Sequence, residues 1–416
     1  MKYILIALIF LISISISAEI LIPMDNFSQT NHLKAYGIAF EALKKQIVVK
    51  WLLNYRGGSW LFPDYPELEN LCNIRGVSYE KISSLEVVNI MNEIDASNMD
   101  VVVLEKEPKI AVYVPPNKQP WDDAVTLALT YAQIEYETLW DEEVLSGKLA
   151  DYDWLHLHHE DFTGQYGKFY SAYRNTSWYK EDVRINEDMA YSLGYSKVWQ
   201  MKHAVVEKIR EYVKNGGFLF AMCAACDTFD IAQAAINLDI CESVFDGDEK
   251  DPNFKSKLDF KRTFAFENFT LIPSPYVYEF STIDASDYAK LRGPEQDFFQ
   301  LFDFSAKYDP VPTMLTQCHI NVINGFLGQT TSFHKEYVKK SVIILGESPG
   351  VDEVKYLHGN FGKGTFTFYG GHDPEDYQHR IGDPETVLDL HKNSPGYRLI
   401  LNNILFPAAE KKKLKT

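Results

Sequence analysis

One apolar run restricts the fold of this chain more than any other segment. Phe218–Met222 contains only apolar residues and lies between two helix-like segments, the first of which ends at Gly216-Gly217. A short strand without a polar face is typical of a central strand in a parallel sheet that helices cover on both faces. Because strand-like and helix-like runs alternate through most of the sequence, we predict an α/β fold of this kind.

The alternation also predicts the domain boundaries. We expect a small N-terminal α/β unit at residues 19–107 and a main domain at 108–407. The regular alternation breaks at about 241–340, where acidic and proline-rich stretches alternate with aromatic runs such as Thr263–Phe266. We interpret this segment as a β-rich insertion. Residues 408–416 form a basic tail.

Residues 1–18 have the layout of a secretory signal peptide. Lys2 supplies a positive charge, Ile4–Ile16 is almost entirely apolar, and small residues follow up to Ala18. We therefore predict an exported protein, periplasmic or secreted. The apolar run is shorter than the roughly 20 residues that a membrane-spanning helix needs, and no later segment is long and apolar enough, so we expect no stable membrane span.

The composition excludes one class of function. The formal net charge is −17, whereas binding of nucleic-acid phosphates requires a basic surface, so we expect no nucleic-acid partner. The five cysteines are too few for a disulfide scaffold, and their odd number leaves at least one thiol outside any pair within the chain. The oligomeric state is left open.

The first candidate site is the junction after the apolar strand. Cys223 follows the strand directly, and a helix-like segment begins at once. A sharp strand-to-helix turn exposes a nucleophile and requires small residues nearby, which Ala221 and Ala225 supply. The helix N-terminus would lower the pKa of the thiol, and the Ala224 N–H could point at a developing oxyanion. The alternatives are a buried core cysteine and a redox pair with Cys226.

The second candidate site follows the predicted strand Thr365–Tyr369. His372 lies three residues after this strand, with Asp373 and Glu375 close behind it. A Cys–His pair needs a third group that orients the imidazole, and either carboxylate could do so. The alternative is a turn whose polar residues only cap a helix.

The third candidate site follows the predicted strand at residues 153–158. His158 ends this strand, and His159, Glu160 and Asp161 come next. Ligands bind at the carboxyl ends of strands in open α/β sheets, so we expect this segment to lie beside the other two candidates. It could form a substrate-binding or oxyanion loop, a metal site built from imidazole and carboxylate, or a structural histidine cluster. We assign no metal and no cofactor to it.

These segments carry a resemblance to a known fold. Ile110–Ile236 together with Ser341–Pro407 resembles the class I glutamine amidotransferase-like fold, especially its ThuA-like relatives. The resemblance implies a flavodoxin-like parallel sheet, a catalytic Cys223, and a partner histidine and glutamate at His372 and Glu375. Here alanines replace the glycines of the family's cysteine turn, and an extra Asp373 separates the histidine from the Pro-Glu pair.

The whole sequence, including residues 51–59 and 158–161, also resembles an exported bacterial family often labelled asparagine synthetase B. Synthesis of asparagine needs ATP, and a nucleotide site usually needs a phosphate-binding loop at a helix N-terminus. No double glycine in this sequence leads into Asp-Ser, and no Gly-x-x-x-x-Gly-Lys loop is present. We therefore expect no ATP-dependent synthesis.

Two functions follow from the sequence. The first is a Cys-dependent hydrolase of a small amide or of a peptide- or sugar-linked amide. In it Cys223 attacks, His372 transfers the proton, and Glu375 or Asp373 orients the imidazole. The second is a non-catalytic protein that binds a glycan, a peptide or a partner protein on the same fold.

Overall fold

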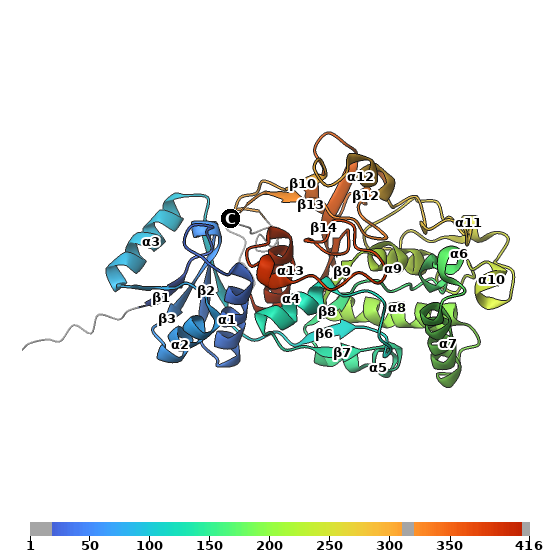
Figure 1. Ribbon diagram of the computed structural model, residues 1–416, viewed down its shortest axis with the longest axis horizontal. Coiled ribbons are helices and arrows are strands. Elements are labelled where there is room, and N and C mark those ends of the chain that lie inside the picture. The colour runs from blue at the N-terminus through green and yellow to red at the C-terminus, as the bar shows by residue number, and fades with distance from the viewer. Residues whose placement is uncertain (1–18, 310–319, 410–416) are drawn as a thin grey trace, which may run out of the picture.

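The computed structural model describes residues 19–309 and 320–409. The predicted signal peptide and residues 410–416 of the predicted tail lie outside these ranges. The described residues form two sheets, and Figure 1 shows the smaller, N-terminal sheet at one end of an elongated molecule. The coarse prediction of a mixed α/β protein is therefore confirmed.

The N-terminal sheet is antiparallel, with strand order β4-β1-β3-β2-β5. Its strands are β1 (Glu19–Ile22), β2 (Val49–Leu53), β3 (Ser59–Pro63), β4 (Glu80–Ile82) and β5 (Asp100–Leu104). Its helices are α1 (His32–Lys44), α2 (Pro66–Arg75) and α3 (Ser84–Ala96). The core centres on Trp60 of β3, whose ring lies 4.7 Å from that of Tyr36 and 6.0 Å from that of Trp51. The Tyr36–Trp60 pair is edge-on, and pairs of this kind stabilise a core beyond their buried area.

The second sheet has ten strands in the order β11-β10-β13-β14-β15-β9-β8-β6-β7, with β12 paired to β14. The strands are β6 (Ile110–Tyr113), β7 (Glu137–Leu139), β8 (Trp154–Leu157), β9 (Phe218–Met222), β10 (Phe298–Leu301), β11 (Val322–Asn324), β12 (Phe333–His334), β13 (Ile343–Glu347), β14 (Glu353–Phe361) and β15 (Gly364–Tyr369).

Only half of this sheet is parallel. The neighbours β7, β6, β8, β9 and β15 all run in one direction, as predicted. The strands from β15 to β11 alternate in direction, so the expectation of a wholly parallel sheet is wrong for this half. The cause is local, because β14 and β15 are joined by a turn at Gly362-Lys363, and so short a connection allows only antiparallel pairing.

The segment at 241–340, which we interpret as a β-rich insertion, contributes strands to the large sheet. Its strands β10 and β11 extend the large sheet, and the expected strand at Thr263–Phe266 forms only an isolated bridge between Phe266 and Val338. The remaining α-helices among the described residues are α4 (Ala124–Ala132), α5 (Asp141–Ser146), α6 (Tyr170–Tyr173), α7 (Ser177–Ser192), α8 (Val198–Asn215), α9 (Ala224–Ala234), α10 (Ser243–Asp246), α11 (Phe254–Lys257), α12 (Ser286–Arg292) and α13 (Pro395–Leu405).

Helices α4 and α13 join the two sheets. They lie between the sheets in Figure 1, and α1 of the N-terminal unit packs against both. Arg398 of α13 is fully buried and reaches across this junction. It donates to the Tyr36 hydroxyl at 2.8 Å, to the Met24 carbonyl at 3.2 Å and to the Gly57 carbonyl. The N-terminal unit is therefore continuous with the core of the large domain.

None of the helices within residues 19–309 and 320–409 combines the length and apolar character that crossing a bilayer requires.

Candidate functional site

Four strand ends meet at one edge of the parallel half-sheet. β8 leads into His158 and His159, β9 into Cys223, and β15 into the turn that carries His372. β6 leads into a proline-rich loop that ends at Asp122 and Asp123, where Asp123 caps α4 by accepting from two main-chain N–H groups. The carboxyl ends of parallel strands share an edge, which is why segments so distant in sequence come together here.

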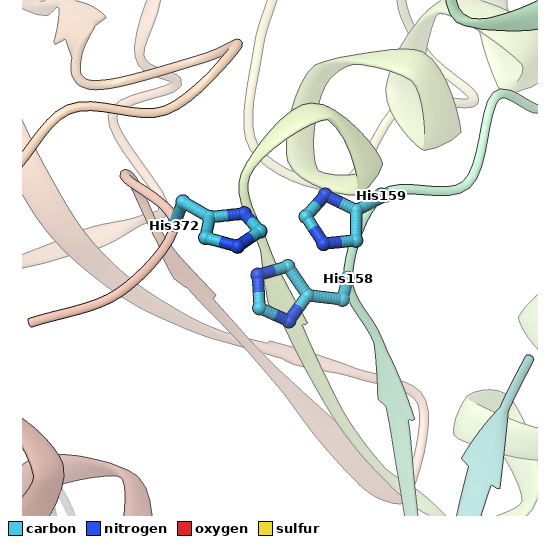
Figure 2. A group of neighbouring side chains, drawn as sticks. All are labelled: His158, His159 and His372. Atoms are coloured by element: carbon cyan, nitrogen blue, oxygen red, sulfur yellow. The ribbon is translucent and has the colours of Figure 1, made fainter. Parts of the chain in front are cut away.

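Three imidazoles face one another at this edge. Figure 2 shows His158 and His159 on the segment after β8 and His372 on the opposite turn. The ring centroids are 4.0 Å apart for His158 and His159, 4.3 Å for His159 and His372, and 4.8 Å for His158 and His372. Each residue offers one ring nitrogen within 4.8 Å of the other two, close enough for the three to approach a single metal ion.

Two neighbouring aspartates hold these rings in place. Asp123 lies between two imidazoles, with one carboxylate oxygen 3.3 Å from His158 Nδ1 and the other 3.3 Å from His156 Nε2. Asp122 Oδ1 lies 3.1 Å from His372 Nε2 and 3.2 Å from His379 Nε2. The main-chain oxygen of Asp122 also lies 3.1 Å from Nε2 of His159. The cluster is therefore built from two carboxylates that each bridge a pair of histidines.

Burial and mutual repulsion keep two of the rings neutral. Burial lowers the pKa of His159 and of His372 well below the usual value, and nearby imidazoles lower both further. For His158, burial acts to lower the pKa, but the Asp123 carboxylate raises it overall. Burial acts to raise the pKa of Asp123, but His156 and His158 lower it well below its usual value. Neutral imidazole is the form that binds a metal or accepts a proton.

The cluster forms one side of a pocket with a volume of about 390 Å³. Asp122, Asp123, His159 and Glu160 line the pocket where it meets the cluster. Its aromatic lining residues are Trp121, Tyr136, Trp140, Tyr166 and Phe169. Its charged lining residues comprise six acids and two lysines, namely Asp122, Asp123, Glu160, Asp161, Asp182, Glu385, Lys118 and Lys202. The pocket is therefore an acidic, aromatic-walled space at the strand edge, the usual position for a ligand site.

Glu160 connects the pocket to the histidines. Its Oε2 accepts a 2.6 Å hydrogen bond from the main-chain N–H of His158. Burial raises the pKa of Glu160 to about 7. A carboxyl group in that range can both accept and donate a proton near neutral pH.

Cys223 has the backbone conformation of a nucleophile turn. Its φ of 50° and ψ of −137° are unusual for a residue other than glycine, and α9 begins at the next residue. The side chain is nevertheless only 1% exposed. Burial raises the pKa of the thiol to about 11, although main-chain N–H groups of Thr330, Gln329 and Ala224 act to lower it. The helix N-terminus therefore does not produce the reactive thiolate that the sequence led us to expect.

A loop at residues 326–331 covers Cys223. The main-chain N–H of Gln329 donates to the sulfur at 3.2 Å. A Cβ on Gly328 would lie 3.0 Å from the sulfur and 2.9 Å from the main-chain nitrogen of His372, so only glycine fits there. Lys355 fixes the loop by donating to the carbonyls of Phe326 at 2.7 Å and Thr331 at 2.8 Å. The pocket described above does not include Cys223 among its lining residues.

The cysteines show no sign of a redox pair within the described residues. Cys72, Cys223, Cys226 and Cys241 are all free. Cys226 donates its S–H to the Ala221 carbonyl at 3.3 Å. This hydrogen bond directs the Cys226 side chain into the core.

Three other predicted site residues take structural positions. Glu375 pairs with His391, with 2.9 Å between the carboxylate and Nδ1, rather than with His372. Asp373 is buried and accepts from the main-chain N–H of Glu375 at 2.8 Å. Asp161 accepts from three main-chain N–H groups of the loop that follows it. The carboxylate that orients His372 is Asp122 instead.

Sequence reasoning missed Asp122, Asp123 and His379. The signal for the first two was present, because an Asp-Asp pair stands between a clear strand and a clear helix. Parallel topology sends the carboxyl end of that strand to the same edge as the others. His379 offered no such signal, because it lies in an irregular segment after β15.

Comparison with known proteins gives little further guidance. No protein-family model matches the sequence, and no curated protein matches it. Among solved structures, the cytoplasmic protein STM3548 from Salmonella typhimurium matches with a TM-score of 0.35 and 12% identity. The match covers 73% of this chain and 100% of that one.

Two further solved structures are similar to a lesser degree. The cytoplasmic protein STM1381 from Salmonella typhimurium LT2 has a TM-score of 0.34 and 12% identity, over 73% of this chain and 100% of that one. Gan42B, a GH42 β-galactosidase, has a TM-score of 0.27 and 10% identity, over 64% of this chain and 28% of that one. Since every TM-score lies below 0.5, these matches assign neither fold nor function.

The matches do correct one expectation. We predicted an exported protein, periplasmic or secreted, but both Salmonella proteins are named as cytoplasmic. The names of these two proteins run against the prediction of export, and we withdraw it. The low TM-scores place this chain in no other compartment.

Proposed function

We propose that this chain is a hydrolase whose reaction centre is the edge of the pocket where Glu160, His159 and Asp122 meet. The observation that carries the proposal is geometric, because these three side chains line one pocket at the carboxyl ends of parallel strands. Residues brought there from separate strand ends are typical of an active site in this fold class.

The lining of the pocket favours a small neutral substrate with a flat apolar face, such as a glycoside or a peptide-like amide. Six acids against two lysines would repel a phosphate or carboxylate substrate. Lys202 is further neutralised by its 2.8 Å ion pair with Asp141. Aromatic rings such as Trp121 and Phe169, whose centroids lie 5.4 Å apart, provide surfaces for stacking against a sugar ring or an amide plane.

The reaction follows from the positions of the polar groups. Glu160 takes a proton from a water molecule, whose oxygen attacks the substrate carbon. For an amide, the bond to the leaving nitrogen breaks, and that nitrogen receives a proton from Glu160. For a glycoside, a second carboxyl group of the pocket has to protonate the leaving oxygen, because acid and base act on opposite faces of the sugar. Asp122 acts indirectly, because it fixes the rings of His159 and His372 that border the reacting water. General acid–base catalysis of this kind contributes about 10²–10⁴-fold to a rate.

We also infer that the parallel half-sheet belongs to the class I glutamine amidotransferase-like fold. Numbered along the chain, the strands β6, β7, β8, β9 and β15 take the order 2-1-3-4-5, the order of flavodoxin-like sheets. The sharp turn at Cys223 between β9 and α9 is a second point of agreement with that fold. The label asparagine synthetase B gains no support from the site, because six acids and only two lysines line its pocket and would repel the phosphates of a nucleotide.

A second candidate function is the Cys-dependent amide hydrolase. The observation in its favour is the strained backbone of Cys223, with main-chain N–H groups directed at the sulfur. Strain at a non-glycine residue is often retained because a reaction needs it. This function requires the loop at 326–331 to move, since the loop covers the sulfur.

One set of variants separates these functions. Purified protein is assayed against chromogenic glycosides, acyl anilides and glutamine, and the hydrolysed substrate is then used with Glu160→Gln, Cys223→Ala and Glu375→Gln. We expect Glu160→Gln to lose at least about 100-fold in kcat, while Cys223→Ala and Glu375→Gln keep activity. Loss in Cys223→Ala alone would favour the second candidate. Saturable binding of a glycan or peptide without turnover would replace both with the binding function.

A further inference from the structure

We propose that His158, His159 and His372 together bind one divalent transition-metal ion, and that zinc is the metal they suit best. This inference goes beyond the proposed function, because it concerns metal binding and does not depend on which substrate the pocket accepts. Three imidazoles without a thiolate form a donor set that suits zinc and similar borderline metals.

The spacing of the rings is close to what a metal requires. Zinc–nitrogen bonds of about 2.0–2.1 Å in a tetrahedral site place ligand nitrogens about 3.3 Å apart. The three residues offer nitrogens within 4.8 Å of one another, so side-chain rotations that move each nitrogen by about one ångström would complete the site. Figure 2 shows the three rings gathered around one shared space.

A buried nitrogen gives an independent indication of a missing ligand. His158 is 1% exposed, and neither of its ring nitrogens makes a hydrogen bond among the residues that the structure describes. Its Nδ1 has the 3.3 Å ionic contact with Asp123, so Nε2 is the nitrogen left for a ligand. A buried polar atom without a partner costs stability, so such atoms are rare in folded proteins. A metal ion at the centre of the three rings would give this nitrogen its partner.

The surroundings of the rings match those of known metal sites. Histidine ligands usually direct their second nitrogen at a carboxylate or a main-chain carbonyl, which fixes the ring and raises its basicity. Here Asp123 lies 3.3 Å from His158 Nδ1, and Asp122 contacts His372 through its carboxylate and His159 through its main-chain oxygen.

The position of the cluster indicates the type of site. Structural zinc sites have four protein ligands, whereas catalytic sites have three and leave one position for water. His159 lines the pocket, so an open coordination position would face the space that a substrate enters. Glu160 lines the same pocket beside it. We therefore assign the cluster to the second type, with water as the fourth ligand.

Two overlapping groups compete for the same ion. Asp122 with His372 and His379, and Asp123 with His156 and His158, also bring one ligand atom each within 4.8 Å. In both, the carboxylate already lies between the two histidines at 3.1–3.3 Å, so a metal would have to displace these contacts. In the three-histidine group these contacts use only one nitrogen of each ring and leave the other nitrogen for a metal, which is why we favour it.

Metal titration tests the proposal without any activity assay. Protein stripped with a chelator is titrated with Zn²⁺ by calorimetry and with Co²⁺ by visible absorption, whose bands report coordination geometry. We expect one equivalent to bind. His159→Ala and His372→Ala should each weaken binding by more than about 100-fold, because even outer contacts to ligands contribute about 10–100-fold. His159→Gln and His372→Gln, with circular dichroism spectra, guard against misfolded alanine variants.

His334→Ala serves as the control, because His334 lies on β12 in the antiparallel half of the sheet and its loss should leave the site intact. His379→Ala tests the competing group at Asp122. Absence of saturable binding would overturn the proposal. Loss of binding in His379→Ala together with retention in His159→Ala would also overturn it, by moving the ion to the group at Asp122. Metal binding without hydrolysis would contradict only the proposed function, and hydrolysis that resists chelation would contradict only the role of the metal.

Discussion

Asp122 orients His372 across a separation of 250 residues, with 3.1 Å between its Oδ1 and the Nε2 of the imidazole. The same carboxylate lies 3.2 Å from His379 Nε2. One side chain from the end of the β6 loop therefore holds two histidines from the segment after β15, and with them the geometry of the candidate site.

Substitution of Asp122 should weaken the site without removing it. Asp122→Asn keeps the size of the side chain but loses the charge that holds His372 and His379. We expect metal affinity and kcat to fall about 10–100-fold, the usual effect of losing an outer contact to a ligand. Calorimetry and steady-state assays measure both. Glu375→Gln is the matched control, because Glu375 contacts His391 instead; equal losses in both variants would contradict a specific role for Asp122.

Cys223 should react slowly with iodoacetamide while the protein is folded. Only the thiolate reacts, and burial raises the pKa of this thiol to about 11. The Cys223 thiol of the folded protein therefore keeps its proton at pH values where the same thiol has lost it in the unfolded protein. This difference stabilises the fold below the unfolded pKa, and the contribution is lost as the pH rises through the folded pKa. Mass spectrometry after timed labelling should find Cys223 modified far more slowly at about pH 8 than in urea; rapid labelling of folded protein would contradict the buried state.

Gly328→Ala should open the loop that covers Cys223. The added Cβ would lie 2.9 Å from the main-chain nitrogen of His372 and 3.0 Å from the sulfur, so the loop must shift. Overpacking of this kind costs about 1–3 kcal/mol. We expect a lower free energy of unfolding in urea and faster labelling of Cys223. Unchanged labelling together with unchanged stability would mean that the loop is not closely packed on the cysteine.

Arg398→Met should destabilise the junction between the two sheets. The buried guanidinium donates to the carbonyls of Met24 and Gly57, and each buried acceptor left without a donor costs about 1–3 kcal/mol. We expect the free energy of unfolding to fall by roughly 3 kcal/mol. Arg184→Met is the control, because its ion pairs with Glu181 and Asp188 are exposed and contribute less than about 1 kcal/mol. Similar effects in both variants would show that Arg398 is not a structural link.

The elements that could be predicted from the sequence are those that local pattern specifies. The strand Phe218–Met222 is β9 with the same bounds, because five consecutive apolar residues after Gly216-Gly217 are typical of a central strand buried on both faces. The abrupt turn at Cys223 was predicted for a similar local reason. The roles assigned to Cys223, His372 and Glu375 in catalysis stay predictions.

The antiparallel half of the sheet was not predicted, since the direction in which two strands pair depends on the connection between them. β14 was not predicted, because most of it is buried on both faces and no alternation of polar and apolar residues results. Its sequence Glu353–Phe361 mixes charged and apolar residues without a clear period. The buried charge of Glu353 is paired with a residue that is distant in the sequence. Arg292, 61 residues earlier, donates to Glu353 at 2.7 Å.

The sequence by itself determined the α/β class, the central strand, and the histidines and carboxylates that end the parallel strands. These follow from residue spacing, which acts over a few residues. The tertiary structure alone decided which of those side chains meet. It placed Asp122 rather than Glu375 beside His372, brought three imidazoles around one space, and covered Cys223 with a loop from about a hundred residues further along the chain. Burial then set the charge states, raising the pKa of Cys223 and lowering those of His159 and His372. The physical reason is that desolvation and contact depend on neighbours in space, and spacing along the chain does not encode them.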